Sequence, residues 1–92
     1  MQSIELKNNL WFLNGDITFK EILSVHDQVQ NYGWKDSVFI DLTGVKELDT
    51  SLLSFILEQR RQAKKFGKEV IVQNQPSSLK SLAKLYGVEQ FI

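Results

Sequence analysis

An amphipathic segment between two strand-like runs limits the folds that this chain can adopt. Residues 50–66 follow the helical period, with an apolar face centred on Leu52 and Ile56. Residues 37–42 before the segment and residues 68–72 after it are short apolar runs of the kind that form strands. A strand, a long helix and a second strand in succession indicate an α/β fold with helices packed on a sheet.

The flanking segments complete an expected element order of β-β-α-β-α-β-α. Two strands, at residues 3–6 and 10–13, are joined by a turn at residues 7–9. The capping-box sequence Thr18-Phe19-Lys20-Glu21 precedes a first helix, and residues 79–86 form a last one. An opening hairpin before the α/β alternation implies a mixed sheet. A length of 92 residues fits a single domain, residues 1–92.

Turn-forming residues set the expected ends of these elements. Residues 14–16, Asn-Gly-Asp, end the second strand, and Thr43-Gly44 turns the chain after residue 42. Gly33, Gly67 and Gly87 each end a helix. Residues 89–92 fit either a short strand or a tail.

Charge and cysteine content exclude several classes of protein. Eleven basic residues balance eleven acidic ones, which argues against a nucleic-acid binder or a polybasic membrane-surface binder. There is no cysteine, so disulfide scaffolds and Cys-ligated zinc modules are excluded. We find no secretory signal and no apolar run near the ~20 residues of a membrane span, and the composition fits a cytoplasmic protein.

The motifs of common enzyme classes are missing from the sequence. It contains no phosphate-binding P-loop, no G-x-G-x-x-G after a strand and no G-x-S-x-G nucleophile turn. A single histidine cannot supply a His-rich metal site. Trp11 and Trp34 are expected to be core and edge aromatics, since no basic residues are interleaved with them. We therefore predict no catalytic residues, no metal and no cofactor.

His26 is the one histidine, and it shares the apolar stripe of Ile22, Val25 and Val29 in the first helix. A general base is one interpretation. A packed, structural histidine is the interpretation that we favour, because the neighbouring stripe positions are apolar.

Two carboxylates, Asp41 and Asp49, bracket the segment between the strand of residues 37–42 and the long helix. One interpretation is a metal or acid–base pair. The other is that Asp41 accepts hydrogen bonds from turn amides while Asp49 caps the helix. We favour the second, because no further ligand is evident nearby in the sequence.

A polar ridge begins at the N-terminus of the long helix, opposite its apolar face. It starts with Thr50 and Ser51, continues through Ser54 and reaches Arg61. Hydroxyls at a helix start either cap its unpaired amides or contact a partner. The pattern alone leaves both roles open.

Part of the sequence resembles the STAS family, the sulfate-transporter and anti-sigma-factor-antagonist domain. The resemblance is carried by "VFIDLTGV" and, directly after a short loop, "LDTSLLSFIL". In that family a strand ends in Asp, here Asp41, and a second Asp precedes hydroxyl residues at a long helix, here Asp49-Thr50-Ser51. The element order agrees over nearly the whole chain, so the resemblance implies a STAS-like mixed sheet packed with helices.

The C-terminal stretch "SSLKSLAKLYGVEQFI" and the segment "QAKKFGKEV" are similar to one STAS branch. That branch is the small cytoplasmic subunit of Mla-type phospholipid-transport ABC complexes at the Gram-negative inner membrane, which maintain outer-membrane lipid asymmetry. The resemblance implies a non-catalytic protein without a cofactor that binds the ATPase subunit and, through it, the membrane permease. It implies a cytoplasmic location, peripheral to the inner membrane through that partner.

The implied contact surface joins the start of the long helix to the last helix. Its expected residues are Asp49, Thr50, Ser51, Ser54, Arg61 and Tyr86.

The same resemblance implies an alternative function, an anti-sigma-factor antagonist that is switched by phosphorylation. Thr50 and Ser51 are then the candidate phosphorylation sites, since signalling members are phosphorylated on the first hydroxyl after Asp. Many members have Gly shortly after the hydroxyl pair, where this chain has Leu52. That departure and the C-terminal stretch favour the accessory subunit.

Overall fold

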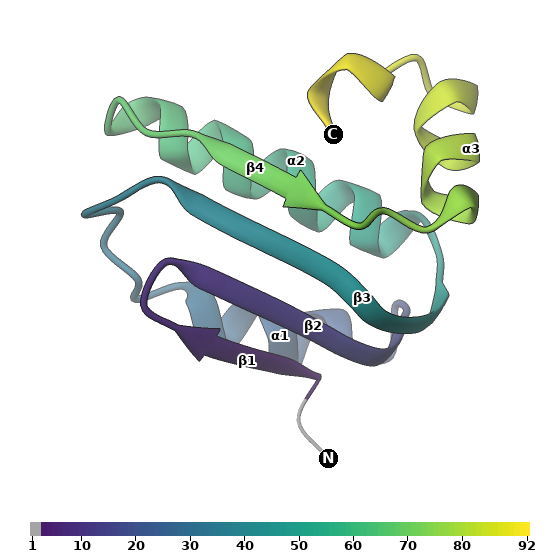
Figure 1. The fold of residues 1–92 in the computed structure, drawn as a ribbon, viewed down its shortest axis with the longest axis horizontal. Coiled ribbons are helices and arrows are strands. Elements are labelled where there is room, and N and C mark those ends of the chain that lie inside the picture. The colour runs from purple at the N-terminus through teal and green to yellow at the C-terminus, as the bar shows by residue number, and fades with distance from the viewer. Residues whose placement is uncertain (1–2) are drawn as a thin grey trace.

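A mixed four-stranded sheet forms the frame of the molecule (Figure 1). The computed structural model describes residues 3–92. The strands are β1 (Ile4–Lys7), β2 (Leu10–Ile17), β3 (Val38–Leu48) and β4 (Val70–Gln73), in the spatial order β1-β2-β3-β4. β1 and β2 form an antiparallel hairpin, whereas β2, β3 and β4 are parallel. The predicted mixed sheet is confirmed.

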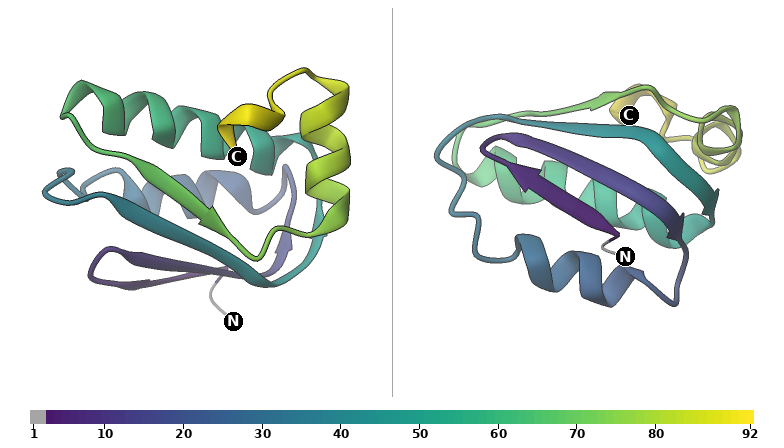
Figure 2. Two further views of the ribbon diagram at one scale, coloured as in Figure 1. Left: turned by 45° about the horizontal axis from the view of Figure 1, so that its top comes forward. Right: turned by 60° about the horizontal axis from the view of Figure 1, so that its bottom comes forward.

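Two helices cover one face of this sheet, and a third lies at its end (Figures 1 and 2). α1 (Ile22–Val29) and α2 (Thr50–Lys65) are the two that cover the face, and α3 (Ser77–Leu85) lies beside the first turns of α2. The order β-β-α-β-α-β-α is therefore confirmed. Residues 89–92, which the sequence left between strand and tail, contain a short 3-10 helix, η1 (Glu89–Phe91).

The core lies between the sheet and the helices. Side chains alternate along a strand, so Val38, Ile40 and Leu42 of β3 all point to the helical layer and are at most 1% exposed. Trp11 of β2 is fully buried and contacts Tyr32 and Trp34, with ring centroids 5.3 and 5.8 Å away. Trp34 is 8% exposed and belongs to the same core, so the core role is confirmed, but neither tryptophan is at an edge.

The two central strands are longer than the sequence indicated. β2 runs through residues 14–16 to Ile17, and β3 continues past Thr43-Gly44 to Leu48. The predicted turns at these two places were wrong. Gly44 pairs with Asn14, and a Cβ on Gly44 would overlap the Asn14 side chain and lie 3.3 Å from the Leu13 carbonyl oxygen. Gly44 is therefore needed for close approach between strands rather than for a turn.

The first helix also differs from its prediction. It begins at Ile22 and ends at Val29, before Gly33. The Thr18 hydroxyl and the Thr18 amide, at 2.7 and 2.8 Å, both donate to the Glu21 carboxylate and lower its pKa. This is one half of the predicted capping box, but Thr18 does not cap α1, whose N-cap residue is Glu21.

His26 is exposed, so the prediction of a packed histidine was wrong. Val25 and Val29 are the buried residues of α1. At 100° per residue they centre the apolar stripe, and His26 falls at its margin, where the side chain reaches solvent.

Candidate functional site

Asp49 begins α2 and holds its first turn. Its Oδ1 accepts a 2.9 Å hydrogen bond from the Ser51 amide, and its Oδ2 accepts a 3.0 Å bond from the Phe19 amide before α1. Partial burial opposes ionisation of the carboxyl, but the Phe19 and Ser51 amides, together with the Ser51 hydroxyl, outweigh it and lower the pKa of Asp49. The predicted capping role of Asp49 is confirmed.

The hydroxyl pair that follows Asp49 does not cap the helix. Thr50 is the first residue of α2 and is exposed, and its hydroxyl makes no hydrogen bond to residues 3–92. Ser51 is half-buried, and it is its amide that Asp49 caps, at 2.9 Å. The Thr50 hydroxyl is therefore available for a contact outside the domain.

A surface hollow of about 320 Å³ opens beside Thr50. We call it the Thr50 hollow, and its lining residues come from the first turns of α2 and from the residues at and after the end of α3. Positions 50, 54 and 57 are on one side of a helix, because residues three and four apart are neighbours. The lining residues of the hollow are uncharged: Thr50, Leu53, Ser54, Leu57, Tyr86 and Val88.

The hollow brings together three of the predicted contact residues, Thr50, Ser54 and Tyr86. It does not include Asp49, Ser51 or Arg61. Thr50 and Ser54 are exposed, and Tyr86 is 59% exposed, although it is a large aromatic side chain.

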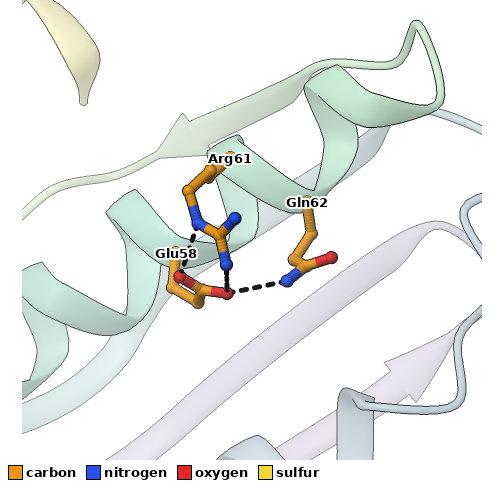
Figure 3. A network of polar contacts seen from close by, with 3 residues as sticks. All are labelled: Glu58, Arg61 and Gln62. Carbon is orange, nitrogen blue, oxygen red and sulfur yellow. Dashed lines mark hydrogen bonds and ion pairs between the residues drawn. The ribbon is translucent and has the colours of Figure 1, made fainter.

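Arg61 lies farther along α2 and has a partner on the same helix (Figure 3). Its guanidinium donates to both oxygens of Glu58, at 3.0 and 2.7 Å, and Gln62 donates a 2.8 Å bond to the same carboxylate. These donors, Arg61 first, lower the pKa of Glu58. The polar ridge thus separates into the Thr50 end and this internal network.

Asp41 accepts hydrogen bonds from nearby groups, as the favoured interpretation predicted, but its amide donor Thr43 lies in β3 and not in a turn. It accepts a 2.8 Å bond from the Thr43 amide and a 3.0 Å bond from the Asn74 side chain. Thr43, through its hydroxyl and its amide, is the main cause of a lowered pKa for Asp41. No three carboxylates or imidazoles in the described part of the chain lie close enough to hold a metal ion.

The apolar residues of the hollow were missed at the sequence level. Leu53 belongs to the core and is 4% exposed, yet it lines the hollow. Val88 lies beyond Gly87, in a segment whose structure the sequence left open. The sequence signal was the adjacent pair of large apolar residues at the end of the last helix, Leu85 and Tyr86, both of which are exposed in the structure.

Comparison with known proteins gives a family and a related fold. The model of the family described as "Mlab, STAS domain" matches residues 12–92. A solved structure described as "Crystal Structure Analysis of Mglu" aligns with a TM-score of 0.61 and 24% identity. The alignment covers 78% of this chain and 19% of that one, so it bears on the fold alone. No curated protein matches. Within residues 3–92, no helix is long and apolar enough to cross a membrane.

Proposed function

The chain belongs to the STAS domain family described as Mlab, and on that premise we propose that it is a non-catalytic accessory subunit of an ABC transport complex. It binds the ATPase subunit and supports its assembly and activity, and through it contacts the membrane permease. The cargo of the complex is phospholipid, the subunit lies on the cytoplasmic side of the inner membrane, and the complex maintains outer-membrane lipid asymmetry.

The Thr50 hollow is the observation that supports this function best. It presents two free hydroxyls and a tyrosine over an apolar floor, at a helix end that Asp49 has already capped. An exposed tyrosine beside an apolar floor is typical of the centre of a protein interface, where aromatic side chains are enriched. We propose that Thr50, Ser54 and Tyr86 contact the ATPase subunit, with Asp49 and Ser51 holding the helix start and Arg61 at the margin.

The electrostatics of the hollow favour an uncharged patch on the partner. None of its lining residues carries a charge, so a charged group buried here would lose its hydration without finding a counterion. The partner surface that fits is an apolar side chain surrounded by groups that hydrogen-bond to hydroxyls.

Affinity purification from the native cell tests the proposal. The tagged chain should retain an ABC ATPase and a permease, and Tyr86→Ala should reduce their recovery. Lys46→Ala, an exposed change on β3, is the control and should retain both proteins. Recovery of neither protein with the wild-type chain would contradict the proposed function.

A second function, a phospho-switched anti-sigma-factor antagonist, is favoured by one observation. The Thr50 hydroxyl is exposed and is not used as a cap, so a kinase can reach it without unfolding the helix. In this case the purification would retain a serine kinase, and mass spectrometry would find phosphate on Thr50 or Ser51. A complete lack of phosphate in cells grown under several conditions would exclude this function.

A further inference from the structure

The outer edge of β4 has unused backbone hydrogen-bonding groups. β4 is the last strand of the sheet formed by residues 3–92 and pairs on one side only, with β3 (Figure 1). Val38 lies opposite Val70, and the Val38 amide donates to the Glu69 carbonyl. In a parallel ladder this means that the backbone hydrogen-bonding groups of residues 69, 71 and 73 face β3. The amides and carbonyls of Val70 and Val72 therefore point away from the sheet.

A groove runs along this edge, between β4, the second half of α2 and the C-terminal turn. We call it the β4 groove, and it has a volume of about 720 Å³. Figures 1 and 2 show the C-terminal turn near β4 and α2 without forming a further strand. The groove is far enough along α2 to be separate from the Thr50 hollow, and the two have no lining residue in common.

The β4 groove is basic although the chain as a whole is neutral. Its lining includes the cationic side chains of Arg60, Arg61, Lys64 and Lys68, against one acidic side chain, Glu69. Like charges gathered at one concave surface raise the local concentration of an oppositely charged partner. The partner that this groove favours is therefore acidic.

The four cations are not equivalent. Arg60 donates a 3.1 Å bond to the outward Val70 carbonyl and lies 5.7 Å from the Phe91 ring, so it fixes the wall of the groove. Arg61 is paired with Glu58. Lys64 and Lys68 have no carboxylate of the described residues within ion-pair distance, and they are the charges left for a partner.

We propose that the β4 groove binds an extended acidic segment of another protein, which adds to the sheet as a fifth strand beside β4. The Val70 amide and the amide and carbonyl of Val72 supply its backbone hydrogen bonds, as in other cases of strand addition, while the Val70 carbonyl is already bonded to Arg60. Alternate side chains of a strand point to one face, so acidic residues at every second position reach Lys64 and Lys68 on the helical side. This binding is additional to the function proposed for the Thr50 hollow and does not depend on it.

A blocked hexapeptide that alternates glutamate and valine is the probe, with lysine in place of glutamate as its charge-reversed control. In NMR titrations of the isotope-labelled chain, the acidic peptide should shift the Val70 and Val72 amides and slow their hydrogen exchange. The lysine peptide should bind at least about tenfold more weakly, and added salt should weaken the acidic peptide. Equal binding of both peptides would overturn the charge argument.

A change to the peptide backbone distinguishes strand addition from simple charge attraction. The same acidic peptide with alternate amides N-methylated keeps its charge but cannot form the ladder, and it should lose most of its affinity. If it binds as well as the unmodified peptide, the segment does not add as a strand.

Two paired variants locate the site. Lys64→Glu with Lys68→Glu should weaken the acidic peptide by about tenfold or more, whereas Lys80→Glu with Lys84→Glu on α3 makes the same charge change elsewhere and should leave binding intact. Anionic phospholipid vesicles test whether the groove binds a membrane surface instead of an acidic protein segment. Vesicle binding that depends on Lys64 and Lys68, without peptide binding, would overturn the proposal.

Discussion

Asp49 accepts a hydrogen bond of 3.0 Å from the amide of Phe19, a residue that precedes a different helix. The other carboxylate oxygen accepts the bond from Ser51 that caps α2. One side chain therefore both begins α2 and joins it to the segment before α1. Because Asp49 caps the helix, the neighbouring Thr50 hydroxyl is not needed for the cap. Asp49 therefore stabilises the fold, and Thr50 is left for a contact.

Because Asp49 caps the helix and Thr50 does not, alanine substitutions at the two positions should affect stability differently. Asp49→Ala should lower the free energy of unfolding by about 0.5–2 kcal/mol, the usual cost of a lost N-cap. Thr50→Ala should change it by less than about 0.5 kcal/mol, because the Thr50 side chain is exposed and does not cap the helix. Urea denaturation of both variants beside wild type measures the difference, and a larger loss for Thr50→Ala would contradict the assignment.

The Asp49 carboxyl also predicts a pH dependence. Its pKa is lower in the folded chain than its ordinary value of 3.8, so the charged form favours folding. That contribution is complete above pH 3.8 and is lost as the pH falls through the lower, folded value. Asp49→Asn removes it, so the stability difference between wild type and this variant should shrink as the pH is lowered from 6 toward about 2.

Denaturation at a series of pH values gives this difference directly. Asp41 and Glu58 also have lowered pKa values, so both proteins lose stability in acid. Only the difference between the two proteins reports on Asp49, and a difference that stays constant with pH would contradict the prediction.

Elements with local signals were the ones that could be predicted from the sequence. α2 starts after a capping Asp49 and ends at Lys65, two residues before a left-handed Gly67, and both signals lie next to the helix in the sequence. The length of β3 depends instead on its neighbour β2, with which it pairs as far as Leu48. A glycine that allows two strands to approach cannot be distinguished, in one sequence, from a glycine that makes a turn.

The candidate site shows the same division. Thr50 and Ser54 share a helix face, so their proximity follows from the helical period. Tyr86 came from the family resemblance, and its position beside Thr50 depends on how α3 packs. Val88 and the β4 groove arise from the path of the C-terminal turn, for which the sequence has no periodic signal.

Gly44→Ala should destabilise the sheet by about 1–3 kcal/mol, because the added methyl overlaps the side chain of Asn14. Asn14→Ala removes the overlapping atoms and should recover part of the loss. The Leu13 carbonyl oxygen, 3.3 Å from the new methyl, keeps the recovery incomplete. A double-mutant cycle by thermal denaturation measures the coupling, and strictly additive effects would contradict this explanation of the glycine.

His26→Gln should leave both the fold and partner recovery nearly unchanged. The side chain is exposed on α1, and exposed substitutions of this kind change stability by less than about 0.5 kcal/mol. Val25→Ala, next to it and fully buried, is the matched control and should cost about 2 kcal/mol. Loss of partner recovery by a folded His26→Gln chain would instead assign His26 to an interface.

Thr50→Glu separates contact from stability most sharply. An acid in the first turn of a helix interacts favourably with the helix dipole, typically by about 0.3–1 kcal/mol, although Asp49 beside it offsets part of this. The free domain should therefore melt near the wild-type temperature. In the complex, the new charge would be buried against a hollow without charged residues, and we expect recovery of the ATPase subunit to fall at least about tenfold.

The matched control for this charge is Ser24→Glu, an exposed hydroxyl on α1 that does not line the Thr50 hollow. It adds the same charge and should retain the partner. Phosphorylation of Thr50 would act in the same direction as glutamate with more charge, about −1.5 to −2. If Thr50→Glu recovers the partner as well as Ser24→Glu does, then Thr50 is not at the interface, and the partner binds another face of the domain.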